Sequence, residues 1–208
     1  MADYTFYTNP MSRGQIARWA LHEAGADYQQ VLVDWQDKGA LLRVNPMGKV
    51  PTLVHHDGGH DHVVTEAAAI CHYLAEMSAT ELLPRDHEKA DYFRWLFFAA
   101  GPLEQAVVAK SMGWEVPGDR GGMVGFGSLE RTVDALDGWL QEHAFVCGDR
   151  FTMADVYVGS QVGWGLAFGS LPRRPAFEAY DKRLDERAAR RAGRAIDDEL
   201  IAEAQAKA

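Results

Sequence analysis

Cysteine is scarce in this chain, which contains only Cys71 and Cys147 among its 208 residues. The two are far apart and form neither a C-x-x-C pair nor a zinc-ligand spacing, which excludes a disulfide-stapled fold and a dithiol redox motif. The first residues lead directly into strand-like sequence without a recognisable secretory leader. We therefore expect a protein of the reducing cytoplasm.

Long apolar runs and an excess of positive charge are missing as well. No stretch approaches the ~20 apolar residues that a membrane-spanning helix needs. The 30 acidic side chains outnumber the 21 lysines and arginines, and the formal net charge is −9. Because phosphate backbones repel an acidic chain, nucleic acid is not expected as a partner. Because no apolar run is long enough to span a bilayer, a membrane is not expected either.

The first 78 residues alternate strand and helix patterns. Two-residue periodicity indicates strands, and apolar residues at helical spacing indicate helices. In chain order the segments are a strand at 4–7, a helix from 12, a strand at 28–33, a hairpin at 52–64 and a helix from 65. This βαβ–ββα order predicts an α/β unit with a four-stranded mixed sheet.

After a polar segment at 79–88, no convincing strand pattern remains. Helices are expected at 91–112 with a kink at Gly101-Pro102, at 128–143, from 152, and at 175–194. Thr152 and Asp155 have the spacing of a capping box at the start of the third of these helices. The predicted division is an α/β domain at 1–78, a linker at 79–88 and an all-helical domain at 89–208.

Three motifs follow one another along the chain. Residues 45–53 read NPMGKVPTL, residues 65–74 read TEAAAICHYL, and residues 148–155 read GDRFTMAD. Together they resemble the cytosolic glutathione transferase superfamily, with the first two in its thioredoxin-like N-terminal domain and the third at a helix cap of its all-helical C-terminal domain. The resemblance covers nearly the whole chain. It implies that fold, with glutathione as co-substrate and no metal.

The resemblance assigns a glutathione site to Lys49, Val50, Pro51, Glu66 and Ala67. It implies a cis Val50–Pro51 bond that turns the Val50 backbone toward the cysteinyl backbone of glutathione, as in strand addition. Glu66 would pair with the γ-glutamyl ammonium, the helix start would receive the γ-glutamyl carboxylate, and Lys49 would face the glycyl carboxylate. The alternatives from local chemistry are an acidic helix-start residue for Glu66 and a solvated loop residue for Lys49.

Position 67 departs from the family pattern, which usually has Ser there. Ala67 has no hydroxyl to hold the γ-glutamyl carboxylate, and a lost charge-assisted hydrogen bond costs roughly 1.5–3 kcal/mol, or about tenfold to a hundredfold in affinity. Backbone N–H groups at the helix start are still available to the carboxylate. Ala67 therefore also supports a hypothesis in which the fold binds partners without catalysis.

Activation of the glutathione thiol requires a hydrogen-bond donor near its sulfur, because the thiolate is the nucleophile. The loop after the first strand offers these candidates: Tyr7, Thr8, Asn9, Ser12 and Arg13. Ser12 is the first choice, because it lies close to where serine-type members place their donor and at a helix N-terminus that favours a thiolate. Asn9 is the second choice. The alternative for Ser12 is simple N-capping of the helix, and the lack of a cysteine in the loop argues against cysteine-type members.

An apolar pocket for a second substrate is expected between the two domains. Its candidate walls are Trp95, Phe98, Met112 and Trp114, with Phe126. Aromatic residues at helical spacing are also typical of a protein core, so both interpretations stay open for each of them.

Four histidines, His55, His56, His60 and His62, lie in or beside a turn at Asp57-Gly58-Gly59. His60 and His62 could chelate a metal ion. The four do not form a closed ligand set with a familiar spacing, and we expect a solvated turn.

The function that follows from the resemblance is conjugation of the glutathione thiolate to small apolar electrophiles. The alternatives are a glutathione-dependent peroxidase or disulfide reductase, and a non-catalytic binding protein on the same fold. The family usually forms homodimers, so a second copy is an expected partner. Neither the electrophile nor the physiological role follows from these residues.

Overall fold

The computed structural model of the chain describes residues 2–206. Contacts between its elements define two compact units: one comprises the residues up to Leu83 together with those from Asp185 onward, and the other runs from Pro84 to Leu184. The last helix therefore belongs by contact with the α/β unit. The limits 1–78, 79–88 and 89–208 stay a prediction from the sequence.

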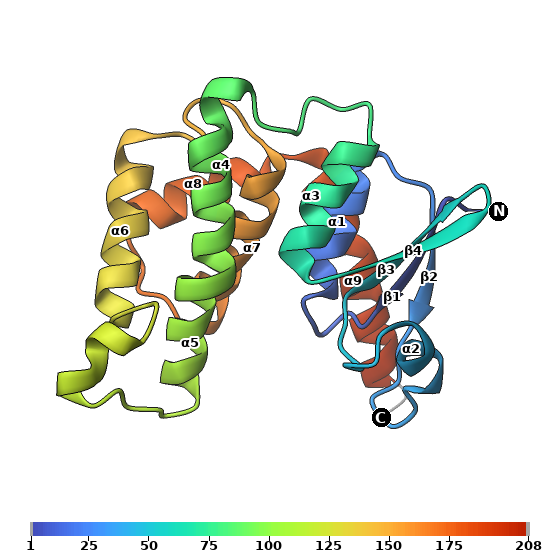
Figure 1. Ribbon diagram of the computed structural model, residues 1–208, viewed down its shortest axis with the longest axis horizontal. Helices are drawn as coiled ribbons and strands as arrows, with labels where there is room; N and C mark the ends of the chain where they lie inside the picture. The colour runs from blue at the N-terminus through green and yellow to red at the C-terminus, as the bar shows by residue number, and fades with distance from the viewer. Residues whose placement is uncertain (1, 207–208) are drawn as a thin grey trace. The chain divides into compact units, whose positions relative to one another are not determined.

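The first unit is built on a four-stranded sheet with the order β2-β1-β3-β4, shown in Figure 1. Its strands are β1 (Tyr4–Thr8), β2 (Tyr28–Leu32), β3 (Thr52–Asp57) and β4 (His60–Thr65). β1 pairs parallel with β2 and antiparallel with β3, and β3 pairs antiparallel with β4. This confirms the predicted mixed sheet. β1 and β2 are parallel because a crossover helix joins them, and β3 and β4 are antiparallel because a tight turn joins them.

Helix α1 (Gly14–Ala24) packs against both α3 (Ala67–Met77) and α9 (Ala188–Ala206). The core between these helices and the sheet consists of fully buried apolar side chains, including Phe6, Ile16, Leu21, Leu53, Ile70 and Leu74. A short helix, α2 (Gly39–Val44), was not predicted. It buries only Leu41, so its sequence carries almost no helical periodicity.

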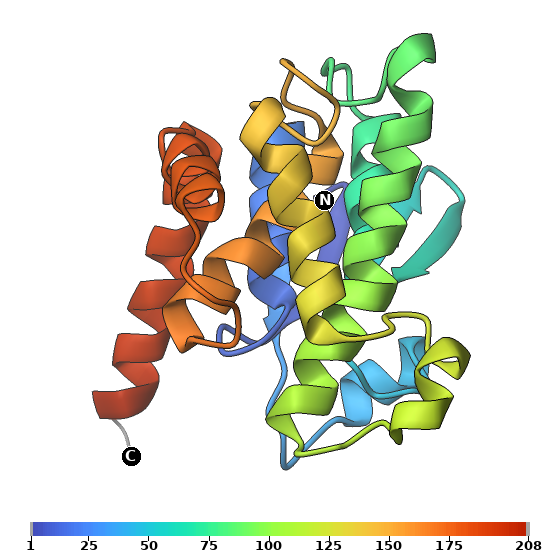
Figure 2. The ribbon, with the colours of Figure 1, turned by 90° about the vertical axis from the view of Figure 1, so that its left-hand side faces the viewer.

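The second unit consists of helices and loops apart from one isolated β-bridge between Phe145 and Gly148. Its helices are α4 (Lys89–Phe98), α5 (Glu104–Ser111), α6 (Leu129–Glu142), α7 (Met153–Phe168) and α8 (Pro175–Asp185). The predicted kink at Gly101-Pro102 is a π-helical segment, Ala99–Leu103, that joins α4 to α5. In both views α6 runs alongside this α4–α5 helix (Figures 1 and 2). The α/β plus all-helical architecture is thus confirmed.

One predicted helix is wrong. The pattern over 175–194 predicted a single helix, but α8 ends at Asp185 and α9 begins at Ala188. Arg187 lies in the break and donates two hydrogen bonds, of 2.6 and 2.7 Å, to the Glu23 carboxylate at the end of α1. Tertiary contacts therefore interrupt a segment whose local composition favours one continuous helix.

The capping box at the start of α7 is confirmed and extends into a buried network. Asp155 is fully buried, and its Oδ2 accepts hydrogen bonds from the Thr152 backbone N–H (2.8 Å) and hydroxyl (3.1 Å). Its Oδ1 accepts from the Val146 backbone N–H (2.9 Å) and the Tyr180 hydroxyl (2.8 Å). One carboxylate therefore joins α7, α8 and the loop that precedes α7.

The start of α1 lies very close to the end of β1. A Cβ atom on Gly14 would lie 2.0 Å from Thr8 Oγ1 and 3.1 Å from the Asn9 carbonyl oxygen. Only glycine fits this approach without displacing the loop between β1 and α1. The Thr8 hydroxyl is buried and has no hydrogen-bond partner among the described residues.

We expect Gly14→Ala to lower the free energy of unfolding by about 1–3 kcal/mol, since the added methyl group overpacks a closed site. Adding Thr8→Ala removes the nearest atom and should recover part of this loss, while Thr8→Ala alone completes the double-mutant cycle. Urea denaturation of the four proteins measures these differences. Equal stability of Gly14→Ala with and without Thr8→Ala would show that the Thr8 hydroxyl is not the obstacle.

Candidate functional site

Three loops meet at one end of the sheet because of the strand register. Thr52, the first residue of β3, pairs with Tyr7 near the end of β1 and with Thr65 at the end of β4. The segments just before β3, just after β1 and just after β4 therefore share that end. They carry Val50 and Pro51, the loop that begins at Asn9, and Glu66 with Ala67.

Asn45 anchors the loop that precedes β3. Its buried side-chain amide donates to the Lys49 carbonyl (3.0 Å) and to Thr52 Oγ1 (3.0 Å), and its Oδ1 accepts from the Met47 N–H (3.0 Å). Gly48 has a φ of +59° and donates its N–H to the Asn45 carbonyl (2.9 Å), a conformation that suits glycine. This anchoring role was not predicted, although the Asn-Pro dipeptide is a turn signal.

The Val50–Pro51 peptide bond is cis, as the resemblance implies. Pro51 is buried, Val50 is half-buried and Lys49 is exposed. Within residues 2–206, no hydrogen bond is formed with the backbone N–H or C=O of Val50, which lies just outside β3. An extended peptide can therefore add to the chain at this residue.

Glu66 precedes α3 with an unusual backbone conformation, φ +65° and ψ 116°, and no other non-glycine residue in the described chain has a positive φ. Such a conformation costs on the order of 1–3 kcal/mol and is concentrated at functional sites. The Glu66 side chain is exposed and makes no capping bond to α3. Ala67, the first residue of α3, is 7% exposed. The Glu66 carboxylate therefore lies next to the N-terminus of α3, where backbone N–H groups attract anions.

Ser12 and Asn9 both hold the loop between β1 and α1. The Ser12 hydroxyl donates to the Asn9 carbonyl (2.6 Å) and accepts from the Gly14 N–H (3.0 Å). The Asn9 side chain donates to the Val33 carbonyl (3.1 Å) and accepts from the Met11 N–H (2.9 Å). Ser12 is half-buried just before α1, and its two hydrogen bonds hold the loop that leads into this helix.

Comparison with known families matches both units. Residues 2–76 match the model of the glutathione S-transferase N-terminal domain, and residues 124–187 match that of the C-terminal domain. The chain belongs to the cytosolic glutathione transferase superfamily.

Individual relatives agree with this family. The Escherichia coli (strain K12) disulfide-bond oxidoreductase YfcG is 35% identical over 104 residues, which is 47% of this chain and 48% of that protein. Glutathione S-transferase GstA of Escherichia coli O157:H7 is 29% identical over 80% of this chain and 85% of its own length. The structure of a sphingomonad glutathione S-transferase complexed with glutathione superimposes with a TM-score of 0.73 at 25% identity, over 93% of this chain and 98% of that one.

The aromatic residues predicted to line the pocket of this transferase-like chain are not all in one place. Trp95 is fully buried, and its ring lies 5.1 Å from that of Phe98 and 5.5 Å from that of Trp139. This packing corrects the interpretation of Trp95 as a pocket wall, because the side chain belongs to the core of the helical unit. Phe98 is half-buried beside it.

Met112 and Trp114 lie beyond the end of α5 and are 61% and 62% exposed. Trp114 lines a hollow of about 470 Å³ together with Phe126, Val116 and Lys110. Of the pocket residues expected from the sequence, the structure therefore brings Trp114 and Phe126 together. Glu115 and Ser128 also line this hollow, so its walls are partly polar and partly apolar.

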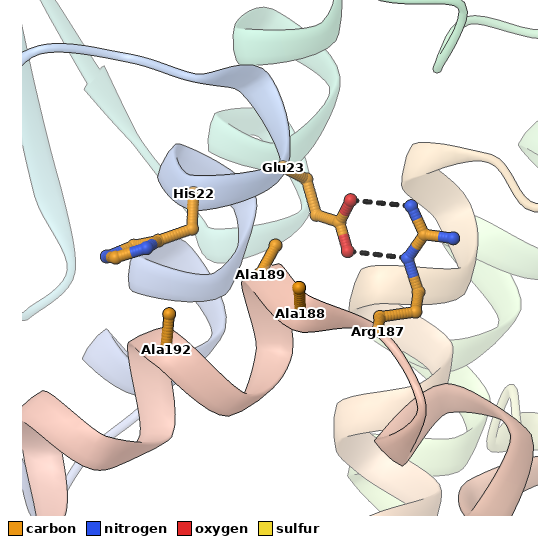
Figure 3. Close-up of a pocket in the computed structure, with 6 residues that line it drawn as sticks. All are labelled: His22, Glu23, Arg187, Ala188, Ala189 and Ala192. Atoms are coloured by element: carbon orange, nitrogen blue, oxygen red, sulfur yellow. Dashed lines mark hydrogen bonds and ion pairs between the residues drawn. The ribbon is translucent and has the colours of Figure 1, made fainter.

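A second hollow, of about 540 Å³, lies where α1 ends and α9 begins (Figure 3). The bidentate pair between Glu23 and Arg187 forms one wall, His22 and three alanines of α9 form the rest, and Trp19 Nε1 also donates to Glu23 (2.8 Å). Because it is at the C-terminal end of α1, about 16 Å along the helix from the Ser12 loop, it is separate from the residues predicted to bind glutathione.

Neither cysteine has the properties of a reactive thiol. Burial raises the pKa of the Cys71 thiol well above its usual range and raises the pKa of Cys147 to about 12. Both are free cysteines, and neither follows β1. In the described part of the chain, no group of three or more His, Cys, Asp or Glu side chains has an arrangement that could hold a metal ion. No described helix is both long and apolar enough to cross a bilayer.

Proposed function

We propose that the chain is a cytoplasmic glutathione transferase that conjugates the glutathione thiolate to small apolar electrophiles. The observation that carries the proposal is the convergence of three features at one end of the sheet: the free Val50 backbone, the exposed Glu66 carboxylate at the start of α3, and the Ser12 loop. Together they offer a strand edge, a cation partner and an anion-binding helix end.

Glutathione would lie along this end of the sheet. The Val50 N–H and C=O pair with its cysteinyl residue, Glu66 pairs with its γ-glutamyl ammonium, and backbone N–H groups at the start of α3 hold the γ-glutamyl carboxylate. Lys49 is exposed, and its ammonium would face the glycyl carboxylate. No metal is needed, because the protein has only to orient glutathione and stabilise its thiolate.

Replacing Ser12 by Ala tests the proposed thiol activation. Lowering the pKa of a thiol by two units takes roughly 2.7 kcal/mol of differential stabilisation, so we expect kcat/KM with an aryl halide to fall about tenfold to a hundredfold. The apparent pKa of the bound glutathione thiol, read from the pH dependence of kcat/KM, should rise. Ser111→Ala, at an exposed position at the end of α5, is the matched control. A larger loss in Asn9→Ala would assign the donor to Asn9 instead.

Ala67→Ser is expected to strengthen glutathione binding. The new hydroxyl at the start of α3 can donate to the γ-glutamyl carboxylate, and one charge-assisted bond is worth roughly 1.5–3 kcal/mol, or about tenfold to a hundredfold in Kd. Calorimetric titration of glutathione measures the change. Ala69→Ser, at an exposed position of the same helix, should leave Kd unchanged. Equal affinities of wild type and Ala67→Ser would contradict the placement of the carboxylate at Ala67.

Disulfide reduction is a second candidate, favoured by the identity with YfcG. Here the glutathione thiolate attacks a substrate disulfide, forms a mixed disulfide and releases a substrate thiolate, and a second glutathione completes the reduction to give glutathione disulfide. The glutathione thiols supply both electrons, which agrees with the absence of a cysteine near Ser12. Turnover of a small disulfide but not of an aryl halide would favour this reaction.

We also propose a homodimer. Phe93 and Phe97 lie on α4 with their rings stacked 6.4 Å apart, and they are 39% and 65% exposed. Two exposed aromatic side chains that are neighbours on one helix face are typical of an interface between copies. Sedimentation equilibrium measures the oligomeric state directly.

A further inference from the structure

The hairpin formed by β3 and β4 carries histidine on both strands near its turn. Its cross-strand pairs are His55 with His62 and Asp57 with His60. Because alternate residues of a strand point to opposite faces, and directly paired residues point to the same face, these four side chains share one face of the hairpin. His56 and Asp61 are paired on the other face, where they form an ion pair of 2.7 Å.

Side chains on the four-residue face are already near one another. The ring centroids of His55 and His62 are 6.3 Å apart, and those of His60 and His62 are 6.5 Å apart. The Nε2 atom of His62 lies 3.9 Å from the Asp57 carboxylate. Ring nitrogens lie about 2 Å from a bound Zn²⁺, so the centroids of two coordinating rings are roughly 5–6 Å apart. Asp57, His60 and His62 are exposed, so their side chains are free to change rotamer when an ion binds.

We propose that the face formed by His55, Asp57, His60 and His62 binds a divalent transition-metal ion of the Zn²⁺ class. Imidazole nitrogens with a carboxylate oxygen are a donor set that suits Zn²⁺, whereas Mg²⁺ and Ca²⁺ prefer oxygen ligands alone. The ligands are not yet gathered around one point, so the ion itself draws the side chains together. The site is distinct from the glutathione site, because it lies toward the opposite end of β3 from Val50.

Two neighbouring side chains hold the ring of His55 in place. Its Nδ1 atom forms a 2.8 Å hydrogen bond with the Tyr73 hydroxyl, and its ring stacks on Tyr4 with centroids 4.5 Å apart. These contacts fix the ring and leave Nε2 to coordinate, in the manner in which partners of ligating histidines orient them. The other three side chains are exposed and contribute little to the core.

The ligand set is larger in the structure than in the sequence pattern, which predicted a solvated turn, because the pairing of β3 with β4 cannot be read from the sequence. In the sequence, His60 and His62 stand out as a chelating pair because they are two histidines separated by one residue. The register adds His55 and Asp57 from the neighbouring strand and increases the ligand set from two to four. Local acidity helps as well, since the Asp57 carboxylate and the net charge of −9 attract a cation.

Titration of Zn²⁺ into the full chain, in competition with a chromophoric chelator, tests the proposal. One ion per chain is expected, with Kd weakened at least tenfold in His62→Ala and in His60→Ala. Tyr73→Phe should weaken binding by roughly tenfold through loss of the orienting bond to His55. His87→Ala, an exposed histidine outside the hairpin, is the matched control and should bind Zn²⁺ like wild type.

Co²⁺ provides a second readout, because its visible absorption reports coordination by nitrogen ligands. The spectrum should appear with the wild type and His87→Ala and disappear with His62→Ala. Circular dichroism and glutathione binding should be unchanged in His62→Ala, so the outcome is independent of the transferase proposal. Absence of stoichiometric Zn²⁺ binding, or equal binding by His62→Ala and wild type, would overturn the proposal and leave a solvated turn.

Discussion

Asp155→Ala is expected to lower the free energy of unfolding by about 4 kcal/mol or more, the largest stability effect of any single replacement considered for this chain. The carboxylate accepts four hydrogen bonds, two of them from backbone N–H groups. Removing it leaves those buried donors without an acceptor, and each such donor costs on the order of 1–3 kcal/mol. Since typical domains are stable by about 5–15 kcal/mol, a loss of this size removes a large share of the stability of the protein.

Urea denaturation followed by tryptophan fluorescence measures this loss. Asp149→Ala is the matched control, because Asp149 is exposed in the loop before the same helix, and it should change stability by less than about 0.5 kcal/mol. Asp155→Asn should be intermediate, because one oxygen remains while the new amide N–H₂ faces hydrogen-bond donors. A loss below about 1 kcal/mol in Asp155→Ala would mean that water or a rearranged side chain replaces the carboxylate.

Glu66→Ala is expected to weaken glutathione binding about tenfold to a hundredfold, through loss of the ion pair with the γ-glutamyl ammonium. Calorimetric titration measures the change in Kd. Glu76→Ala, an exposed glutamate on the solvent side of α3, is the matched control and should bind glutathione like wild type. Equal affinity of Glu66→Ala and wild type would refute the assignment of Glu66 to the glutathione site.

Glu66→Gly separates the carboxylate from the backbone conformation. Glycine accepts a φ of +65° without steric cost, whereas Ala at this position keeps the strain. Glu66→Gly should therefore lose glutathione affinity to the same extent as Glu66→Ala, yet unfold at a higher temperature than Glu66→Ala. If Glu66→Gly is the less stable of the two, the strain argument fails while the binding argument stands.

Local pattern was sufficient for the long, regular elements. The strands at β1 and β2, the capping box of α7 and the helix α6 were predicted because alternation, capping residues and helical spacing are properties of neighbouring residues. The sequence pattern gave wrong results where contacts between distant residues, rather than neighbours in the chain, determine the structure. α2 buries a single leucine, and the helix predicted over 175–194 is interrupted at Arg187 because that residue binds Glu23 of α1.

The candidate site was predicted unevenly for the same reason. Val50, Pro51 and Glu66 are proposed as glutathione ligands from the two motifs that contain them, and the cis bond at Pro51 is present. The anchoring role of Asn45 was missed, because its partners are fixed only when the loop folds back on Thr52. Trp95 was placed in a pocket although it is fully buried, since helical spacing identifies an apolar face without saying what covers it.

By itself, the sequence determined the order of the four strands, the family, and the residues proposed for glutathione, because each depends on residues close together in the chain. Only the tertiary structure decided which of these residues meet. The pairing of Thr52 with Tyr7 and with Thr65 brings three separate loops to one end of the sheet. The same hairpin register places His55 opposite His62. Register is a relation between distant strands, and it is set by the packing of the whole sheet against its helices.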